Sequence, residues 1–165
     1  MRIQDIMHTF TACCRTTDSL NQAAHLMWEH DCGALPVIGA DGRLVGMITD
    51  RDVCMAASTE GKVLTALRVA DAMTSEVVTC NQSQDVNQVV KAMALGRVRR
   101  APVVDNDRRV IGMVTIGDVA RATTQAHARL QGLSCESVVA TMAAICSPRR
   151  EGVPAHPAHA DNARA

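Results

Sequence analysis

The sequence is poor in aromatic residues and has no excess charge of either sign. Of its 165 residues only 1% are aromatic, with one Trp, one Phe and no Tyr, so the core must be built from aliphatic side chains and the nine methionines. Basic and acidic residues are equal in number, 17 of each. Nucleic-acid binding usually needs a basic field, and binding of single strands also uses stacking aromatics. We therefore expect no nucleic-acid partner.

Long apolar runs and a regular cysteine framework are also missing. No run approaches the about 20 residues of a membrane-spanning helix, so no membrane association is expected. The first seven residues include Asp5 and no continuous apolar stretch, unlike a signal peptide. Seven cysteines at irregular spacing favour reduced thiols. These features together predict a cytoplasmic protein.

The strongest feature of the sequence is an internal duplication with an offset of 66 positions, the separation of Thr49 from Thr115. The register needs no gap from Arg2 to Ala57, which chance does not explain. The offset exceeds the about 20–50 residues of solenoid repeats, so two copies of one subdomain with pseudo-two-fold symmetry are expected. Matching pairs include Arg2 and Arg68, Asp5 and Asp71, Met27 and Met93, Pro36 and Pro102, Gly46 and Gly112, and Asp52 and Asp118.

Each copy has the hydrophobic pattern strand, helix, strand, strand, helix, which predicts an α/β (α+β) fold. Pro36 suggests that its strand starts there or lies at a sheet edge, because proline donates no hydrogen bond. In the first copy the elements are expected at Leu20–His30, Ala34–Ile38, Arg43–Ile48 and Thr49–Ser58. In the second they are expected at Val86–Leu95, Ala101–Asp105, Arg109–Val114 and from Ile116 onward.

The predicted domain organisation follows the copies. We expect a first subdomain over residues 1–58, a linker over 59–67, a second subdomain over 68–131, a C-terminal helix within 132–146 and a disordered tail over 147–165. The tail is expected to be disordered because it is rich in Pro, Ala and His and lacks apolar periodicity.

Three motifs recur in both copies and carry a resemblance to a known family. Gly46–Asp52 and Gly112–Asp118 both read Gly-apolar-apolar-Thr-x-x-Asp, Ala34–Val37 and Arg100–Val103 both end in Pro-Val, and Asp5–Met7 and Asp71–Met73 lead into the copies. Together they resemble the CBS-domain pair, or Bateman module, over residues 1–125. Ala144–Pro148 is similar to the end of small stand-alone members of the hypoxic-response group.

The residue types suit nucleotide recognition. A threonine at a strand-to-helix junction places a hydroxyl and backbone N–H groups at the positive end of the helix, where phosphates bind. An aspartate three residues later lies one turn on, where its carboxylate can accept ribose hydroxyls. Apolar strand residues would then sandwich the base.

The resemblance implies two clefts, each combining residues of both copies. The first would hold Thr49, Arg51 and Asp52 with Val78, Thr79, Arg99, Arg100 and Ala101, and the second Thr115 and Asp118 with Ala12, Cys13, Gly33, Ala34 and Leu35. Arginine pairs phosphates in a forked geometry, so the first cleft is expected to hold the phosphates.

The resemblance further implies a regulatory protein. The expected ligand is an adenine compound, namely AMP, ATP, ADP, NAD or S-adenosylmethionine, with no required cofactor and no metal. Two chains would associate through their helices into a disc of four CBS domains and act on an effector protein that the sequence does not identify. We expect no enzyme activity, because no Ser-His-Asp order, paired catalytic carboxylates or P-loop is present.

Other interpretations remain open at this point. Thr49 and Thr115 could serve only as helix caps, and the clefts of a dimerisation or partner-binding module would stay empty. A metal- or redox-responsive protein is the other alternative. It would use His25, His30 and Cys32, or the adjacent Cys13 and Cys14.

Overall fold

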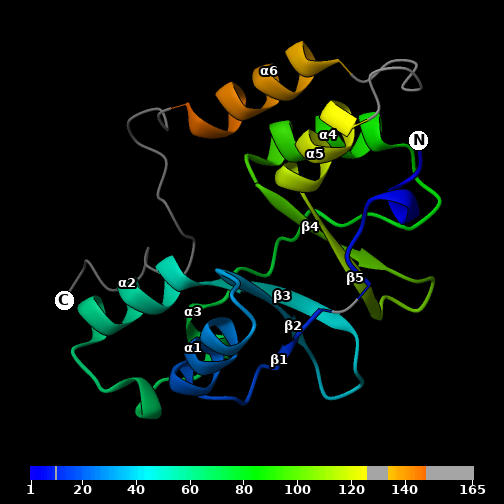
Figure 1. Cartoon of the computed structure of the whole chain (residues 1–165). Helices are drawn as coiled ribbons and strands as arrows, with labels where there is room; N and C mark the ends of the chain where they lie inside the picture. The colour runs from blue at the N-terminus through cyan, green and yellow to red at the C-terminus, as the bar shows by residue number, and fades with distance from the viewer. Residues whose placement is uncertain (10, 126–133, 148–165) are drawn as a thin grey trace. The chain divides into compact units, whose positions relative to one another are not determined.

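The computed structural model describes residues 1–9, 11–125 and 134–147, which divide into two compact units (Figure 1). The first-repeat unit comprises residues 12–77. The second-repeat unit combines residues 1–11 with residues 78–147. The compact units therefore do not follow the boundaries of the sequence repeats, since the segment that leads into the first repeat packs with the second. The predicted helical residues 126–131 and the predicted tail from residue 148 lie outside the described residues.

The first-repeat unit is a three-stranded sheet with helices. Ser19 caps the first long helix by accepting a hydrogen bond from the backbone of Gln22, and Gly61 ends the second in the left-handed region with φ of 61°. Strands run in the order β1-β2-β3, with β1 parallel to β2 and β2 antiparallel to β3. The elements are β1 Cys14–Arg15, α1 Leu20–Glu29, β2 Ala34–Ile38, β3 Leu44–Thr49, α2 Asp50–Glu60, the 3-10 turn Leu64–Ala66 and α3 Val69–Ala72.

The second-repeat unit repeats this pattern with one strand fewer and with an added C-terminal helix, while its leading segment forms a 3-10 turn where the first-repeat unit has α3. Its first strand shortens to a single bridge between Cys80 and Val103, and an added helix, α6, packs on α4 and α5 (Figure 1). The elements are the 3-10 turn Ile3–Asp5, α4 Val86–Gly96, β4 Arg100–Val104, β5 Val110–Thr115, α5 Ile116–Gln125 and α6 Cys135–Cys146. The mixed α/β fold class predicted from the sequence is confirmed.

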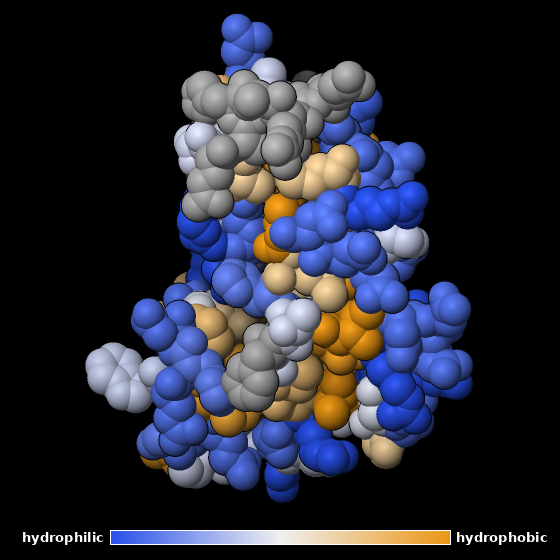
Figure 2. All heavy atoms as spheres, turned by 45° about the vertical axis from the view of Figure 1, so that its right-hand side comes forward, coloured by the Kyte–Doolittle hydropathy of each residue, from blue (hydrophilic) through white to orange (hydrophobic). Residues whose placement is uncertain are grey.

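Each unit has its own aliphatic core. Ile3 and Val69, which occupy equivalent positions in the two repeats, are both fully buried, one in each core. Polar residues cover much of the face shown in Figure 2, and apolar side chains show between them in patches. None of the described helices has the length and hydrophobicity that crossing a bilayer requires.

Pro36 was expected at the start of a strand or at a sheet edge, and this expectation is wrong. Pro36 lies in the middle of β2, and β2 is the central strand of its sheet. The sheet tolerates it because β1 reaches only Val37 and Ile38. On the other side Pro36 pairs with Met47 of β3. The N–H of Met47 points away from Pro36 and donates to the carbonyl of Thr74. The missing N–H of proline therefore interrupts no ladder hydrogen bond.

The segment that leads into each repeat pairs with the last strand of the other repeat, which is β5 for the first segment and β3 for the second. In the second-repeat unit, His8 and Met113 exchange two backbone hydrogen bonds of 2.9 Å. Met47 and Thr74 exchange two of the same length in the first-repeat unit. Each unit thus contains one repeat and the segment that leads into the other.

We predict that Gly112→Ala destabilises the protein, because the added Cβ would lie 2.6 Å from the carbonyl oxygen of His8. Pushing backbone apart costs about 1–3 kcal/mol, measurable as a lower midpoint in urea. Gly117→Ala is the control, since its Cβ would meet nothing closer than 3.4 Å and alanine favours the helix. Equal midpoints for Gly112→Ala and the wild type would contradict the close packing of the leading segment.

Candidate functional site

The two Thr–Asp pairs predicted as the centre of the site form the same structure in both units. Thr49 ends β3, and its Oγ1 donates to Oδ2 of Asp52 over 2.7 Å while the backbone N–H of Asp52 donates back over 3.2 Å. Thr115 and Asp118 repeat these two hydrogen bonds at the same distances after β5. The backbone N–H of each threonine also donates to the carboxylate, at 2.9 and 2.8 Å. Both pairs are capping boxes at a helix N-terminus.

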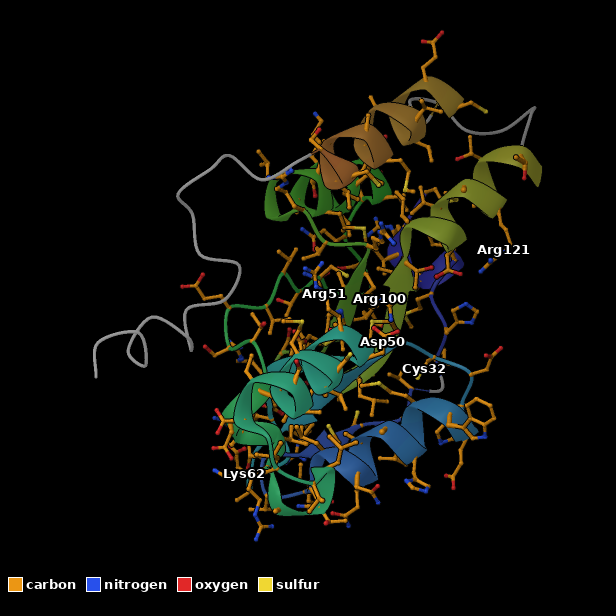
Figure 3. All side chains as sticks on the ribbon, turned by 90° about the vertical axis from the view of Figure 1, so that its left-hand side faces the viewer. Cys32, Asp50, Arg51, Lys62, Arg100 and Arg121 are labelled. Atoms are coloured by element: carbon orange, nitrogen blue, oxygen red, sulfur yellow. The ribbon has the colours of Figure 1, made fainter. Side chains whose placement is uncertain are left out.

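Asp118 also lies in a cluster with His8 and Arg121, in addition to its contacts with Thr115. Its side chain is only 3% exposed, yet Nε2 of His8 lies 2.8 Å from its Oδ1. Nη2 of Arg121, one helical turn further along α5, pairs with the same oxygen. Figure 3 shows Arg121 extending from α5. The side chains of His8 and Arg121 are 62% and 61% exposed, so an imidazole and a guanidinium lie at the surface above a buried carboxylate.

The first-repeat unit has no such cluster at the equivalent positions. Thr74 stands where the second-repeat unit has His8, and Met55 stands where it has Arg121. Arg51, predicted as a phosphate ligand, is exposed on the first turn of α2. The sequence motifs predicted arginines only in the first cleft and indicated neither His8 nor Arg121. The spacing of Arg121, three residues after Asp118 on a helix, is the signal that indicates it.

The strand residues of the predicted site lie beside the threonine of their own repeat. Ala34 pairs with Thr49 in the sheet, and the carbonyl of Gly33 accepts from the N–H of Asp50 over 3.2 Å. Leu35 follows in the same strand and is 1% exposed, so its side chain belongs to the core.

The second-repeat unit has the matching arrangement. Arg100 pairs with Thr115, and the carbonyl of Arg99 accepts from the N–H of Ile116 over 2.9 Å. Ala101 is fully buried. The side chain of Arg99 donates toward Sγ of Cys146 over 3.6 Å, at the end of α6.

Four predicted residues lie in the segments before the strands. Ala12 and Cys13 immediately precede β1, and Val78 and Thr79 precede the bridge at Cys80. All four are partly buried. The predicted pairing of each Thr–Asp motif with strand residues of the other repeat stays a prediction.

The seven cysteines are free thiols, and two of them are buried. No group of three or more His, Cys, Asp or Glu side chains able to hold a metal occurs among the described residues. Burial raises the pKa of Cys14 to about 12 and that of Cys80 to about 11, and Asp18 adds to the shift of Cys14. Burial also raises the pKa of Cys13. A thiol with a raised pKa forms little thiolate at neutral pH, which disfavours the adjacent Cys13 and Cys14 as a redox sensor.

Comparison with known proteins gives a consistent result. The sequence profile of the CBS domain matches residues 3–59 and 69–124. Hypoxic response protein 1 of Mycobacterium tuberculosis is 32% identical over 145 residues, covering 88% of this chain and 94% of that protein. A crystal structure of hypoxic response protein 1 with two coordinated zinc ions has a TM-score of 0.67 at 32% identity and covers 73% of this chain and 98% of that one.

Two other solved structures are complexes with adenine compounds. The CBS domain pair of protein MJ0100, in complex with 5′-methylthioadenosine and S-adenosyl-L-methionine, has a TM-score of 0.69 at 29% identity, covering 76% of this chain and 97% of that one. CBSX2 in complex with AMP has a TM-score of 0.67 at 28% identity, covering 76% of this chain and 98% of that one.

The raised thiol pKa values predict a loss of stability at alkaline pH. Cysteines in the unfolded chain lose their protons near the ordinary pKa of 9.0, whereas Cys80 keeps its proton until about pH 11. The unfolded state therefore gains stability as pH rises from 9 toward 11, so the free energy of unfolding falls. Urea midpoints at pH 7 and pH 10 measure this, and Cys80→Ala should make the fall smaller. Cys146→Ala, at an exposed position, should leave the fall unchanged, and an identical fall in both variants would contradict the prediction.

Proposed function

Since the chain belongs to the CBS domain family, we propose that it is a regulatory module that binds an adenine nucleotide and signals through a change in conformation or assembly. CBS-domain pairs are generally regulatory rather than catalytic, and the family match indicates no catalytic family. The AMP complex of CBSX2 and the S-adenosyl-L-methionine complex of the MJ0100 pair support an adenine ligand. The ligand changes the balance between two states only if it binds one of them more tightly.

The observation that carries the proposal is the repeated Thr–Asp junction. In both units a carboxylate is fixed within a helix turn by a threonine hydroxyl and backbone N–H groups. A carboxylate held in this way is preorganised to accept two hydroxyl groups, as a ribose presents. The positive end of the same helix favours a phosphate nearby.

Arg121 and His8 make the phosphate assignment different from the one expected from the sequence. We assign the phosphate-bearing ligand to the cleft of Thr115 and Asp118, because Arg121 supplies a positive charge there and His8 a ring nitrogen. In the cleft of Thr49 and Asp52 the equivalent residues are uncharged, and the side chain of Arg99 is directed at Cys146. Charge-assisted hydrogen bonds to phosphate are about twice as strong as neutral ones.

The wider setting of the module remains part of the proposal. We expect two chains to form a homodimer of four CBS domains that acts on an effector protein. The expected location is the cytoplasm. The module would then signal to another protein and not to a domain within the described residues. Zinc coordination is a property of the hypoxic response protein 1 structure and is not part of this proposal.

A ligand-free interaction module is the second candidate function. It is favoured by the capping boxes, because a helix cap by itself accounts for both Thr–Asp pairs. The two candidates differ in whether the aspartates contribute to ligand binding as well as to stability.

Thermal melting with adenine ligands separates the two candidates. At a ligand concentration about 100 times the dissociation constant, we expect about 2.7 kcal/mol of stabilisation by AMP, ADP, ATP, NAD or S-adenosylmethionine. Asp52→Ala or Asp118→Ala should abolish the shift, measured against the melting temperature of each variant without ligand. Asp107→Ala, at an exposed turn, is the control and should keep it. No shift with any ligand would support the interaction module.

The phosphate assignment predicts a selective effect of Arg121→Met, which introduces the residue found at the equivalent Met55. We expect the dissociation constant of AMP to rise about tenfold, the effect of one lost charge-assisted hydrogen bond. The dissociation constant of uncharged 5′-methylthioadenosine should change less than about twofold. Calorimetric titration measures both, with Arg109→Met as the exposed control. Equal losses for the two ligands would place the phosphate away from Arg121.

A further inference from the structure

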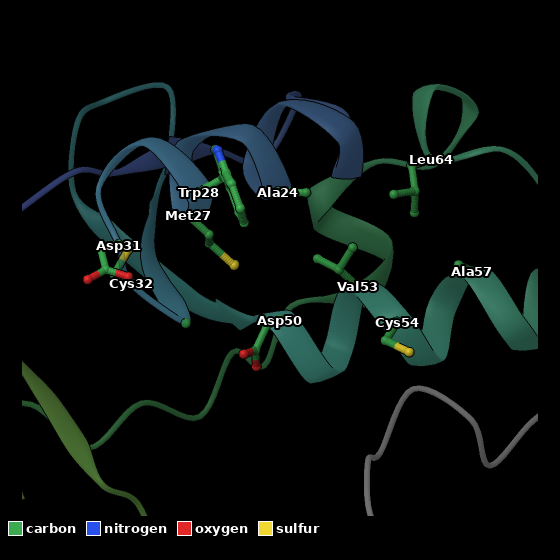
Figure 4. Close-up of a pocket in the computed structure, with 11 residues that line it drawn as sticks. Ala24, Met27, Trp28, Asp31, Cys32, Asp50, Val53, Cys54, Ala57 and Leu64 are labelled. Carbon is green, nitrogen blue, oxygen red and sulfur yellow. The ribbon is translucent and has the colours of Figure 1, made fainter.

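The first junction, formed by Thr49 and Asp52, supplies acceptors for the first three backbone N–H groups of α2. The N–H of Asp50 donates to the carbonyl of Gly33 over 3.2 Å, and that of Asp52 donates to the hydroxyl of Thr49. Between them, the N–H of Arg51 donates to Oδ1 of Asp50 over 2.7 Å. Figure 4 shows Asp50 at the start of α2. Its carboxylate therefore binds the N–H group that a phosphate oxygen would use at a helix N-terminus.

The second junction, formed by Thr115 and Asp118, differs at one of these three N–H groups. The N–H of Ile116 donates to the carbonyl that precedes β4, and that of Asp118 donates to the hydroxyl of Thr115, as in α2. Gly117 lies between them at the position of Arg51, and no described residue accepts from its N–H. An N–H group in the first turn of a helix has no acceptor within that helix. The N–H of Gly117 is therefore available to a ligand.

The glycine also keeps the space beside this N–H open. A Cβ at Gly117 would lie 3.4 Å from Oγ1 of Thr115 and 3.7 Å from Nη1 of Arg121. The absent side chain thus leaves an opening between a hydroxyl and a guanidinium, both of which bind phosphate oxygens. In the first-repeat unit the exposed side chains of Arg51 and Met55 stand at the positions of Gly117 and Arg121.

We propose that Asp50 and Gly117 determine which adenine ligand each junction binds. The second junction binds the phosphate of an adenine nucleotide through the N–H of Gly117 and the guanidinium of Arg121. Asp50 excludes phosphate from the first junction, which binds an adenosine with an uncharged thioether as its 5′ substituent. The inference rests on the proposed nucleotide function and assigns a ligand class to each of its two sites.

Charge at the first turn of each helix favours the same assignment. The first turn of α2 contains two acidic residues, Asp50 and Asp52, and that of α5 contains only Asp118. Arg51 offsets one of the two carboxylates in α2, so a net negative charge stays there. Arg121 offsets the single carboxylate in α5. A phosphate is repelled by an unbalanced carboxylate a few ångströms away, and more so in a site closed to water.

Met55 suits the ligand proposed for the first junction. It lies three residues after Asp52, as Arg121 lies three residues after Asp118, and it is 47% exposed. Its thioether is apolar and polarizable, so it can pack against an uncharged thioether of a ligand. A guanidinium at the same position favours a phosphate instead. The exchange of this one side chain therefore acts in the same direction as Asp50.

Titration calorimetry with AMP tests the role of Asp50. The wild-type chain should bind about one AMP. Asp50→Ala combined with Arg51→Gly and Met55→Arg should give the first junction the groups of the second and raise the stoichiometry to about two. The matched control replaces Asp50→Ala by Glu60→Ala, which removes a carboxylate from the last residue of the same helix, about 15 Å away. The control should still bind about one AMP.

Single variants test the two junctions separately. Gly117→Ala should raise the dissociation constant of AMP about tenfold, because its Cβ fills the opening, and should change that of 5′-methylthioadenosine less than about twofold. Asp52→Ala should do the reverse, with at least about a tenfold rise for 5′-methylthioadenosine and an unchanged AMP affinity. Binding of the unaffected ligand shows in each case that the variant is folded.

The outcomes separate this inference from the proposed function. Two AMP sites of equal affinity in the wild-type chain would overturn the inference and leave the nucleotide function intact. An unchanged AMP affinity in Gly117→Ala would do the same, as would AMP binding that Asp52→Ala abolishes and Asp118→Ala leaves intact. A wild-type chain that binds neither AMP nor 5′-methylthioadenosine would contradict the proposed function itself, and this inference with it.

Discussion

The two backbone hydrogen bonds between His8 and Met113 organise much of the second-repeat unit. They hold the first residues of the chain along β5, which brings Ile3 into the core of that unit and excludes a side chain at position 112. They also place the imidazole of His8 within 2.8 Å of the Asp118 carboxylate. One strand pairing thus brings together a core residue, a close contact at Gly112 and the imidazole of the candidate site.

Local sequence patterns predicted the elements well because local interactions form them. The alternating and helical apolar periods located β2 and α4 to within one residue, and the Thr-x-x-Asp spacing predicted both capping boxes as one of its two interpretations. Where the structure differs from the elements predicted from the sequence, the causes are non-local. The strand before α4 shortens to one bridge at Cys80, and Pro36 is tolerated in a central strand only because β1 is two residues long.

The candidate site shows the same division between local and long-range information. Thr49, Asp52, Thr115 and Asp118 were predictable because each pair lies within one helical turn. His8 was not, because 110 positions separate it from Asp118 and only the folded chain brings them together. An exact repeat would give two equal sites, whereas substitutions at two matched positions place His8 and Arg121 beside Asp118 and leave Thr74 and Met55 at the equivalent positions of the first repeat. A duplicated chain can thereby acquire two ligand preferences from one architecture.

The exchange of leading segments between the units has a consequence for biosynthesis. His8 leaves the ribosome well before its strand partner Met113, so their pairing must wait until the second repeat has been made. The first-repeat unit, in contrast, is complete once Val77 has emerged. Contacts so distant in sequence form slowly because a long loop must close before they are gained. During translation the apolar Ile3 therefore lacks its native core partners until the second repeat is made. By then the described residues of the first-repeat unit have already emerged.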